Sequence, residues 1–249
     1  MPTLHRFFIP PGWIRGNTVT LEHPYVHQIR NVLRMCPGDR IIVLDNSGWE
    51  YITELRTVNR DQVEGQVIEK RLNTSEPRTK ITLYQAVLKG DRFEFVLQKG
   101  TEIGVVSFVP LITERCVIGD LEYAEKKRPR WERIIAEAAE QSGRGFLPRL
   151  ESATLFTTAC SEVKTRGSLA IMPWEGERTR TIKEVLRQDR KPFSISVFIG
   201  PEGGFSKQEV HLARRYGIIP VTLGPRILRA ETAGIVTAAV ILYELGDME

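Results

Sequence analysis

The chain has 249 residues, and its composition of 41% hydrophobic and 27% charged residues excludes a disordered, fibrous or membrane-embedded protein. Its 35 basic and 31 acidic residues leave a net charge of +4, which favours a polyanionic partner but does not require one. A domain has about 150 residues on average, so the length allows one large domain or two unequal ones.

The cysteines and the apolar runs indicate where the protein works. Cys36, Cys116 and Cys160 lie far apart and form no Cys-x-x-Cys pair, which is typical of reduced thiols and not of a disulfide framework or a zinc site. The only apolar core near the start, residues 7–9, is too short for a signal peptide. The longest apolar run, residues 233–245, is shorter than the about 20 residues of a membrane span. We therefore expect a cytoplasmic protein without a membrane segment.

The first 70 residues have the pattern of a small β domain. A short helix is expected over residues 24–35, and strands are expected over residues 40–44, 49–58 and 62–68. Turns rich in Asp, Asn and Gly separate these strands, which is typical of a small barrel or meander. The polar residues 71–78, which include a proline, form the predicted linker.

From residue 80 onward, strand-like and helix-like runs alternate. The expected strands cover residues 81–88, 105–112, 168–172, 193–199 and 218–223. The expected helices cover residues 91–103, 129–141, 182–188, 207–216 and 230–245. Such alternation predicts a mostly parallel sheet covered by helices on both faces.

Several standard sites are excluded by their motifs. The chain has no phosphate loop, no Gly-x-Gly-x-x-Gly after a strand and no Gly-x-Ser-x-Gly elbow. His23 and His27 have the spacing of a zinc-binding pair, but Pro24 and Tyr25 follow His23 where the glutamate of such a site would stand. No metal is expected.

Three loops that follow predicted strands are the informative segments. They cover residues 110–115, 199–205 and 223–233, and in open α/β sheets such loops at the carboxyl ends of strands bind ligands. Gly200, Gly203, Gly204 and Gly224 allow a close approach of the backbone to a ligand. The loops are also compatible with plain tight turns, but two glycine-rich loops at successive strand ends favour a ligand site.

The third loop carries two aliphatic residues, Ile227 and Leu228, between Arg226 and Arg229. They are suited to line an apolar slot for an aromatic ring such as adenine. The alternative, that both pack inward as core, remains open at this point.

These segments resemble the signatures of bacterial 16S ribosomal RNA uridine N3-methyltransferases of the RsmE type, in the SPOUT superfamily. The resemblance is carried by Ile-Gly-Pro-Glu-Gly-Gly-Phe-Ser (residues 199–206) and Leu-Gly-Pro-Arg-Ile-Leu-Arg-Ala-Glu-Thr-Ala (residues 223–233). It extends to Leu-Gln-Lys-Gly-Thr-Glu-Ile-Gly (97–104), Glu-Ala-Ala-Glu-Gln-Ser (137–142), His-Gln-Ile-Arg-Asn-Val-Leu-Arg (27–34) and Pro-Gly-Asp (37–39). It therefore covers nearly the whole chain in order.

The resemblance implies an α/β fold in which a small PUA-like β-barrel that binds RNA, residues 1–72, precedes a SPOUT methyltransferase domain, residues 73–249, with a mostly parallel sheet and a trefoil knot. It also implies a homodimer and S-adenosylmethionine as cofactor. The residues that it places around the cofactor are Met172, Pro173, Ile199, Gly200, Gly203, Leu223, Gly224, Ile227, Leu228, Arg229 and Thr232, flanked by residues 171–175.

The implied reaction is methyl transfer to N3 of a uridine in 16S ribosomal RNA of the small ribosomal subunit. Because a neutral imide nitrogen is a poor nucleophile, the enzyme must help N3 to lose its proton. Arg229 is our candidate to stabilise the negative charge that develops on the uracil oxygens. Glu231, Glu202 and Glu175 are candidate proton acceptors, although a hydrogen bond at a helix start or in a loop is the more common role of such a glutamate.

N3 lies on the Watson–Crick edge, so the target uridine must be unpaired or extruded. Basic residues that contact phosphates and aromatic residues that stack on bases are expected to hold the RNA. The candidates are Arg6, Phe7, His27, Arg30, Arg34, Arg115 and Arg144. Arg30 and Arg34, four residues apart, are expected to share one helix face with His27, which is equally compatible with a solvated basic face. Two alternatives remain: a non-catalytic RNA-binding factor of ribosome assembly, and a SPOUT methyltransferase that acts on transfer-RNA ribose.

Overall fold

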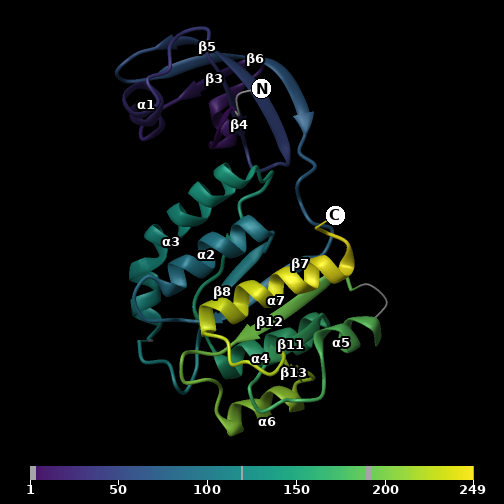
Figure 1. The fold of residues 1–249 in the computed structure, drawn as a ribbon. Coiled ribbons are helices and arrows are strands. Elements are labelled where there is room, and N and C mark those ends of the chain that lie inside the picture. The colour runs from purple at the N-terminus through teal and green to yellow at the C-terminus, as the bar shows by residue number, and fades with distance from the viewer. Residues whose placement is uncertain (1–3, 119, 189–191, 249) are drawn as a thin grey trace. The chain divides into compact units, whose positions relative to one another are not determined.

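The computed structural model describes residues 4–118, 120–188 and 192–248, which form two compact units (Figure 1). The first unit comprises Met1–Glu76 and Ala139–Leu147, and the second comprises Pro77–Ala138 and Pro148–Glu249. The chain leaves the first unit within the predicted linker. The sequence did not predict that Ala139–Leu147 belongs to the first unit. Apolar periodicity identifies a helix, but it does not show against which unit the end of that helix packs.

The first unit is built on a six-stranded sheet of order β1-β4-β5-β6-β3-β2. Its strands are β1 (His5–Phe8), β2 (Ile14–Arg15), β3 (Thr18–Leu21), β4 (Arg40–Leu44), β5 (Trp49–Val58) and β6 (Val63–Leu72). Only β1 and β4 pair in parallel, and the other neighbours are antiparallel. Two register shifts along β5 increase the local twist, so the sheet curls around its apolar side chains. The small β domain is confirmed, with three strands, β1, β2 and β3, that were not predicted.

Short helical turns complete this unit. A 3₁₀ turn, η1 (Pro11–Trp13), precedes β2, and α1 (Tyr25–His27) runs on into a π-helical turn, η2 (Gln28–Val32). Arg34 follows the end of η2 in a left-handed conformation with φ 55°. The prediction that Arg30 and Arg34 share one face of a regular α-helix is therefore wrong, because the helix has ended before Arg34.

Two carboxylates, one buried and one half-buried, hold the first unit together. Glu50 accepts hydrogen bonds from Arg6 at 2.5 Å, Arg71 at 2.8 Å and Asn73 at 2.7 Å. Glu76 accepts hydrogen bonds from the Arg144 guanidinium, the nearer at 2.7 Å, and from the Gly145 N–H at 3.0 Å. Buried charges are tolerated when they are paired and hydrogen-bonded in this way. The Glu76 contacts fix Ala139–Leu147 in this unit.

The second unit is an α/β layer structure with a parallel sheet of order β10-β8-β7-β12-β11-β13, to which β9 adds beside β8. Its strands are β7 (Lys80–Ala86), β8 (Ser107–Ile112), β9 (Arg149–Leu150), β10 (Thr154–Leu155), β11 (Leu169–Pro173), β12 (Ser194–Ile199) and β13 (Ile219–Val221). Every pairing in this sheet is parallel, as predicted.

Helices cover both faces of this sheet (Figure 1). They are α2 (Arg92–Ile103), α3 (Leu121–Ser142), α4 (Phe156–Arg166), α5 (Ile182–Gln188), α6 (Lys207–Arg215) and α7 (Ala230–Leu245). Alternate side chains along β12 enter different cores: Val197 packs with the helices α2, α3, α5 and α7, whereas Phe198 packs with α4 and α6. The strands are therefore buried on both faces, which explains their continuous apolar sequence. The predicted trefoil knot is not tested by the strand order and stays a prediction.

The helix α3 begins eight residues before its predicted start. Proline is favoured in the first turn of a helix, so Pro129 indicated a start there, but the structure places Pro129 inside α3. The helix α4 was not predicted. No helix within the described ranges is both long and apolar enough to cross a membrane.

Candidate functional site

A cleft of ≈ 620 Å³ lies at the carboxyl ends of β11 and β13 in the second unit. One wall is the loop between β11 and α5, residues 174–181, which we call the β11 loop. The other is the loop between β13 and α7, residues 222–229, which we call the β13 loop. The lining residues are Pro173, Trp174, Glu175, Glu177, Arg178, Thr181, Thr222, Leu223, Gly224, Pro225, Arg226, Ile227, Leu228 and Ala233. This volume is within the range of small-molecule sites.

The β13 loop presents its aliphatic residues to the cleft. Gly224 has φ +96°, a conformation that favours glycine, and its N–H donates to the Thr222 hydroxyl at 3.1 Å. Ile227 is 87% exposed, and Leu228 is half-buried in the cleft wall. The alternative that both aliphatic residues pack as core is therefore wrong for Ile227. An exposed Ile at a strand end is an apolar surface available to a ligand.

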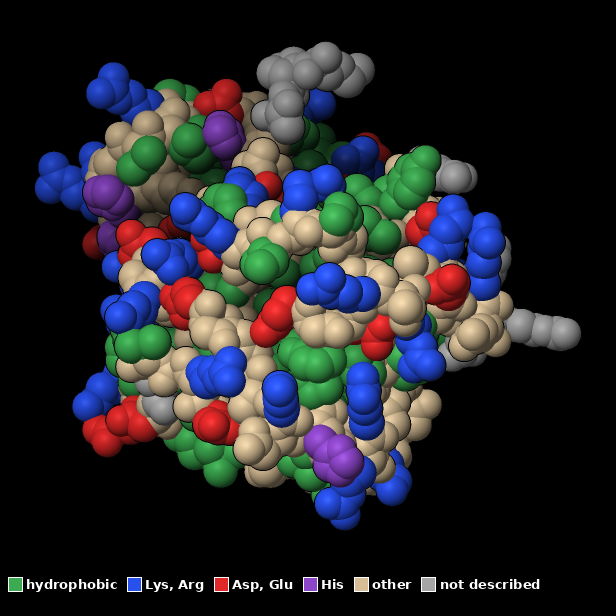
Figure 2. Space-filling model, turned by 60° about the horizontal axis from the view of Figure 1, so that its bottom comes forward, with side chains coloured by type: hydrophobic (Ala, Val, Ile, Leu, Met, Phe, Trp, Pro, Cys, Tyr) green, Lys and Arg blue, Asp and Glu red, His purple; other side chains and the backbone are tan. Residues whose placement is uncertain are grey.

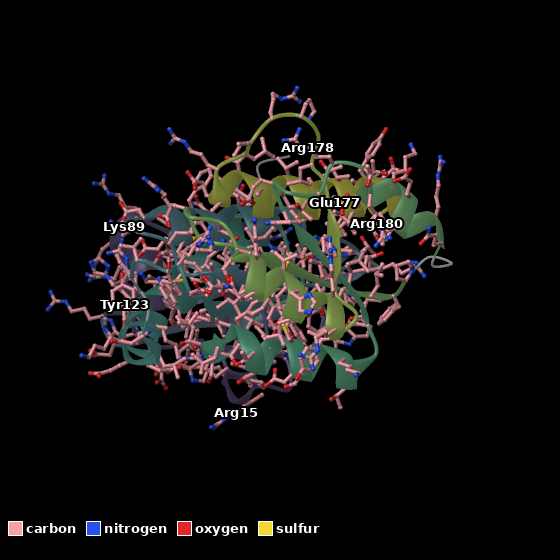
Figure 3. The ribbon with its side chains drawn as sticks, turned by 90° about the horizontal axis from the view of Figure 1, so that it is seen from below. Arg15, Lys89, Tyr123, Glu177, Arg178 and Arg180 are labelled. Carbon is pink, nitrogen blue, oxygen red and sulfur yellow. The ribbon has the colours of Figure 1, made fainter. Side chains whose placement is uncertain are left out.

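The β11 loop is folded around the carboxylate of Glu177, which lies near Arg178 and Arg180 in Figure 3. Glu177 Oε1 accepts hydrogen bonds from the N–H groups of Arg178 and Thr179, each at 3.0 Å, and of Arg180, at 3.3 Å. It also accepts a hydrogen bond from the Thr179 hydroxyl at 2.8 Å. These hydrogen bonds, those from Thr179 first, lower the pKa of Glu177 to about 2. The loop therefore carries an ionised carboxylate at its centre at any physiological pH.

The two walls are joined by backbone hydrogen bonds. The Trp174 N–H donates to the Val221 carbonyl at 3.0 Å, and the Thr222 N–H donates to the Arg180 carbonyl at 2.8 Å. Gly176 lies directly beneath the Trp174 indole, where a Cβ would come within 2.3 Å of the ring. The cleft is thus pre-shaped by contacts within the protein.

The loop between β12 and α6, residues 200–206, supports the cleft and does not line it. Gly204 has φ +66° and lies so close to Glu175 that a Cβ would come within 2.8 Å of its Oε1. The Gly203 carbonyl accepts a hydrogen bond from Arg115 at 2.8 Å. Arg115, a predicted RNA contact, is thus tied to this loop, although its side chain remains exposed.

The predicted cofactor residues fall into two groups. Pro173, Leu223, Gly224, Ile227 and Leu228 line the cleft, whereas Met172, Ile199, Gly200, Gly203, Arg229 and Thr232 do not. The side chains of Met172 and Ile199 lie in the cores on opposite faces of the sheet. Because both side chains are buried, neither forms part of the cleft wall.

The sequence reading missed the polar part of the cleft. Glu177, Arg178 and Thr181 in the β11 loop, and Thr222 at the end of β13, were not among the predicted site residues. The available signal was the run Glu-Gly-Glu-Arg-Thr-Arg-Thr, residues 175–181, which directly follows an apolar strand. It contains one glycine, so it did not have the pattern of the two glycine-rich loops.

The predicted catalytic residues occupy three different environments. Arg229 is exposed and precedes the first turn of α7. Glu231 lies in that turn, and its Oε2 is buried without a hydrogen-bond partner among the described residues. Glu202 Oε1 accepts hydrogen bonds from Arg92 Nη1 at 3.1 Å and from the Lys89 N–H at 3.2 Å. Glu202 therefore ties its loop to the start of α2.

The structure argues against three predicted RNA contacts in the first unit. Phe7 is 1% exposed and packs edge-on against Tyr25, so its ring cannot stack on a base. Arg144 is buried in its ion pair with Glu76, and the half-buried Arg6 is paired with Glu50, so both guanidinium groups are engaged within the protein. The remaining candidates there, His27, Arg30 and Arg34, are exposed.

Among the residues that the structure describes, no three His, Cys, Asp or Glu side chains are grouped so that they could hold an ion.

Comparison with known proteins identifies the family. Residues 74–242 match the model of an RNA methyltransferase domain, and residues 26–68 match that of an RNA methyltransferase PUA domain. The chain is 34% identical to ribosomal RNA small subunit methyltransferase E of Bacillus subtilis, over 91% of this chain and 90% of that protein. It is 35% identical to the Synechocystis protein of the same name, over 95% of this chain and 77% of that protein.

Solved structures agree. The structure of ribosomal RNA small subunit methyltransferase E from Neisseria gonorrhoeae, bound to S-adenosylmethionine, superposes with a TM-score of 0.87 at 32% identity, covering 97% of this chain and 98% of that one. A Legionella pneumophila protein with the same bound cofactor has the same TM-score, identity and coverage. The similarity extends over nearly the whole chain and includes both the β domain and the parallel α/β unit that carries the cleft. The chain therefore belongs to the ribosomal RNA small subunit methyltransferase E family.

Proposed function

We propose that this protein transfers a methyl group from S-adenosylmethionine to N3 of a uridine in 16S ribosomal RNA. The observation that carries the proposal is the pre-shaped cleft at the ends of β11 and β13, in a chain that matches a small subunit methyltransferase E with bound S-adenosylmethionine over 97% of its length. The uridine and its N3 atom come from the resemblance of residues 199–206 and 223–233 to the N3-methyltransferase signatures.

The cleft fits the cofactor in size and in chemistry. Leu223, Ile227 and Leu228 offer an apolar surface for the adenine ring, and main-chain groups of the β13 loop lie beside it. S-adenosylmethionine, when bound, supplies a methyl group on a positively charged sulfur, which is an excellent leaving group. The protein therefore has two tasks: to align the uridine and to make its N3 nucleophilic.

We assign these tasks to two residues near the start of α7. Arg229 is exposed at the end of the β13 loop, and its guanidinium is suited to stabilise negative charge on the uracil oxygens as the N3 proton leaves. Glu231 is our candidate to accept that proton, directly or through a water molecule. Its Oε2, buried and without a hydrogen-bond partner in the described part of the chain, supports this role, because such groups are costly and are found mainly where they have a function. Glu202 is assigned to loop support because Arg92 and Lys89 engage its carboxylate.

The substrate is tested by mass spectrometry of small-subunit RNA from a strain that lacks the gene. We expect N3-methyluridine to be absent and to return when the gene is restored. Persistence of the modified base would contradict the substrate, and a lack of S-adenosylmethionine binding at millimolar concentrations by calorimetry would favour a non-catalytic RNA-binding protein.

Arg229→Ala is expected to lower turnover at least about tenfold with a smaller change in cofactor affinity, since the lost cation acts mainly in the transition state. Steady-state kinetics and calorimetry measure the two quantities. Arg187→Ala on α5, exposed and outside the cleft, is the matched control. Equal losses of turnover and affinity in Arg229→Ala would make it a binding residue only.

We further propose that the protein is a homodimer that works in the cytoplasm on the small ribosomal subunit. The outer face of α7 supports the dimer: Val236, Val240 and Tyr243 lie at helical spacing, with Val240 37% and Tyr243 67% exposed. Light scattering is expected to give twice the chain mass, and Val240→Glu with Tyr243→Glu is expected to give the monomer. A monomeric wild-type protein would contradict the dimer.

A further inference from the structure

The fold of the β11 loop brings two arginines out beside the cofactor cleft. Because Glu177 Oε1 accepts hydrogen bonds from three consecutive N–H groups, the backbone of residues 178–180 wraps around the carboxylate. Arg178 lines the cleft, and Arg180 lines a neighbouring hollow of ≈ 470 Å³ together with Arg214. The loop thus places cations on both sides of a central carboxylate.

Arg226 stands on the opposite wall of the same cleft. Within the described ranges, no carboxylate lies within ion-pair distance of the Arg178 or Arg226 side chain, whereas Arg128, Arg130 and Arg133 on α3 each pair with a glutamate. The Glu177 carboxylate is engaged elsewhere, since its Oε1 accepts hydrogen bonds from the loop and its Oε2 lies 3.8 Å from Arg214. Figure 2 shows the underside of the view in Figure 1, on which Lys and Arg side chains are spread across the surface.

A uridine can react only if its base enters the cleft, and an extruded base carries its sugar and its flanking phosphates to the rim. Arginine is the residue best matched to phosphate, because its planar fork donates two parallel hydrogen bonds. We propose that Arg178 and Arg226 bind the phosphates that flank the target uridine, one from each wall, and that Glu177 is the positioning residue for Arg178. This inference rests on the proposed function and adds the RNA contacts of the methyltransferase unit.

The salt dependence of binding tests the phosphate contacts. The probes are a uridine-containing oligoribonucleotide and small ribosomal subunits from a strain that lacks the gene. A plot of log affinity for the oligoribonucleotide against log salt concentration has a negative slope. In Arg178→Gln and in Arg226→Gln we expect the magnitude of this slope to decrease by about 0.7, because one phosphate contact is lost. We also expect the KM for small subunits to rise about tenfold, and the cofactor affinity, since both side chains line the cofactor cleft, to fall by a clearly smaller factor. Arg187→Gln, an exposed arginine outside the cleft, controls for the loss of one surface charge.

The positioning role of Glu177 has a separate readout. Glu177→Gln keeps the shape of the side chain but loses the charge that attracts three N–H groups, so the loop should present Arg178 less well. We expect the KM for small subunits to rise by a larger factor than kcat falls. The double variant Glu177→Gln/Arg178→Gln should be little worse than Arg178→Gln alone, because both changes remove the same contact.

Two results would overturn the inference. A salt slope in both cleft variants equal to that of Arg187→Gln would show that neither arginine contacts a phosphate. A loss of cofactor affinity that matches the loss of RNA affinity would assign them to the cofactor carboxylate instead. The wild type separates these outcomes from failure of the proposed function: if it methylates small subunits while the variants keep its slope, only the phosphate contacts are wrong.

Discussion

Three glutamates show that the contacts of a side chain decide its chemistry. Glu50 is buried among Arg6, Arg71 and Asn73 and stabilises the first unit. Glu177 folds a loop around its carboxylate, and Glu231 keeps a buried oxygen without a partner among the described residues. The number of donors that face the carboxylate therefore separates a glutamate that stabilises the fold from the one to which we assign a role in the chemistry.

Glu50→Gln should destabilise the protein and weaken its acid sensitivity. Burial opposes ionisation of Glu50, but the hydrogen bonds from Arg6, Asn73 and Arg71 outweigh it, and the pKa of the carboxyl lies below its ordinary value. A lowered pKa means that the stabilisation is present above the unfolded-state pKa of about 4.5 and is lost as the pH falls through the folded-state pKa. Urea denaturation should show a loss of about 3 kcal/mol at neutral pH, because the buried Arg6 loses its counter-charge.

Below the pH at which Glu50 ionises in the unfolded chain, the difference between Glu50→Gln and wild type should shrink. The control is Glu54→Gln on the same strand, whose partners Arg40 and Arg56 are exposed, and which should cost less than about 1 kcal/mol. Equal losses in the two variants would contradict the special role of Glu50.

At the scale of elements, the start of α6 shows a motif whose structure follows from its sequence. Ser206 Oγ accepts a hydrogen bond from the Glu209 N–H at 3.2 Å, and Glu209 Oε2 accepts one from the Ser206 N–H at 2.8 Å. This is a capping box, and its Ser-x-x-Glu spacing is visible in the chain. Glu209 Oε1 also accepts a hydrogen bond from the Glu114 N–H at 2.9 Å, which no local pattern predicts.

Ser206→Ala should lower the free energy of unfolding by about 1 kcal/mol, since the Glu209 N–H loses its acceptor at a buried helix end. Chemical denaturation measures the loss. Lys207→Ala, at an exposed neighbouring position, should change stability by less than about 0.5 kcal/mol. If the two variants behave alike, the cap contributes nothing.

At the scale of the whole molecule, the chain forms two units with separate cores. Its three cysteines differ in burial and can therefore be used as probes of unfolding. Cys36 is exposed in the first unit, Cys116 is half-buried, and Cys160 is buried in the core between the sheet and α4. Burial, and then the charge of Glu209, raise the pKa of the Cys160 thiol to about 12. Thiolates react and thiols do not, so accessibility and pKa act together.

We expect a thiol reagent to modify Cys36 in the native protein within minutes and Cys160 only when the second unit unfolds. Peptide mass spectrometry after timed labelling measures both sites. In urea, the modification of Cys160 should follow the unfolding transition of the second unit. Rapid labelling of Cys160 in buffer would show that this core opens far more often than its packing implies.

The sequence alone determined the alternation of strands and helices in the second unit, the bounds of β5, α5 and α7, and the family, because apolar periodicity and local motifs are properties of neighbouring residues. It also predicted a ligand site at strand ends and most of the β13 wall. It did not predict the β11 wall, whose Glu177 turn has no glycine-rich pattern.

Only the tertiary structure decided which basic side chains are free of internal ion pairs and so available to bind RNA phosphates. Arg144 and Glu76 are 68 residues apart in the chain, and Arg6 and Glu50 are 44 apart, so no local pattern shows that they pair. These ion pairs argue against two predicted RNA contacts, whereas the fold of residues 174–181 brings Arg178 to the cleft. Charge could be counted from the composition, but its accessibility depends on contacts between distant residues, and those exist only in the folded chain.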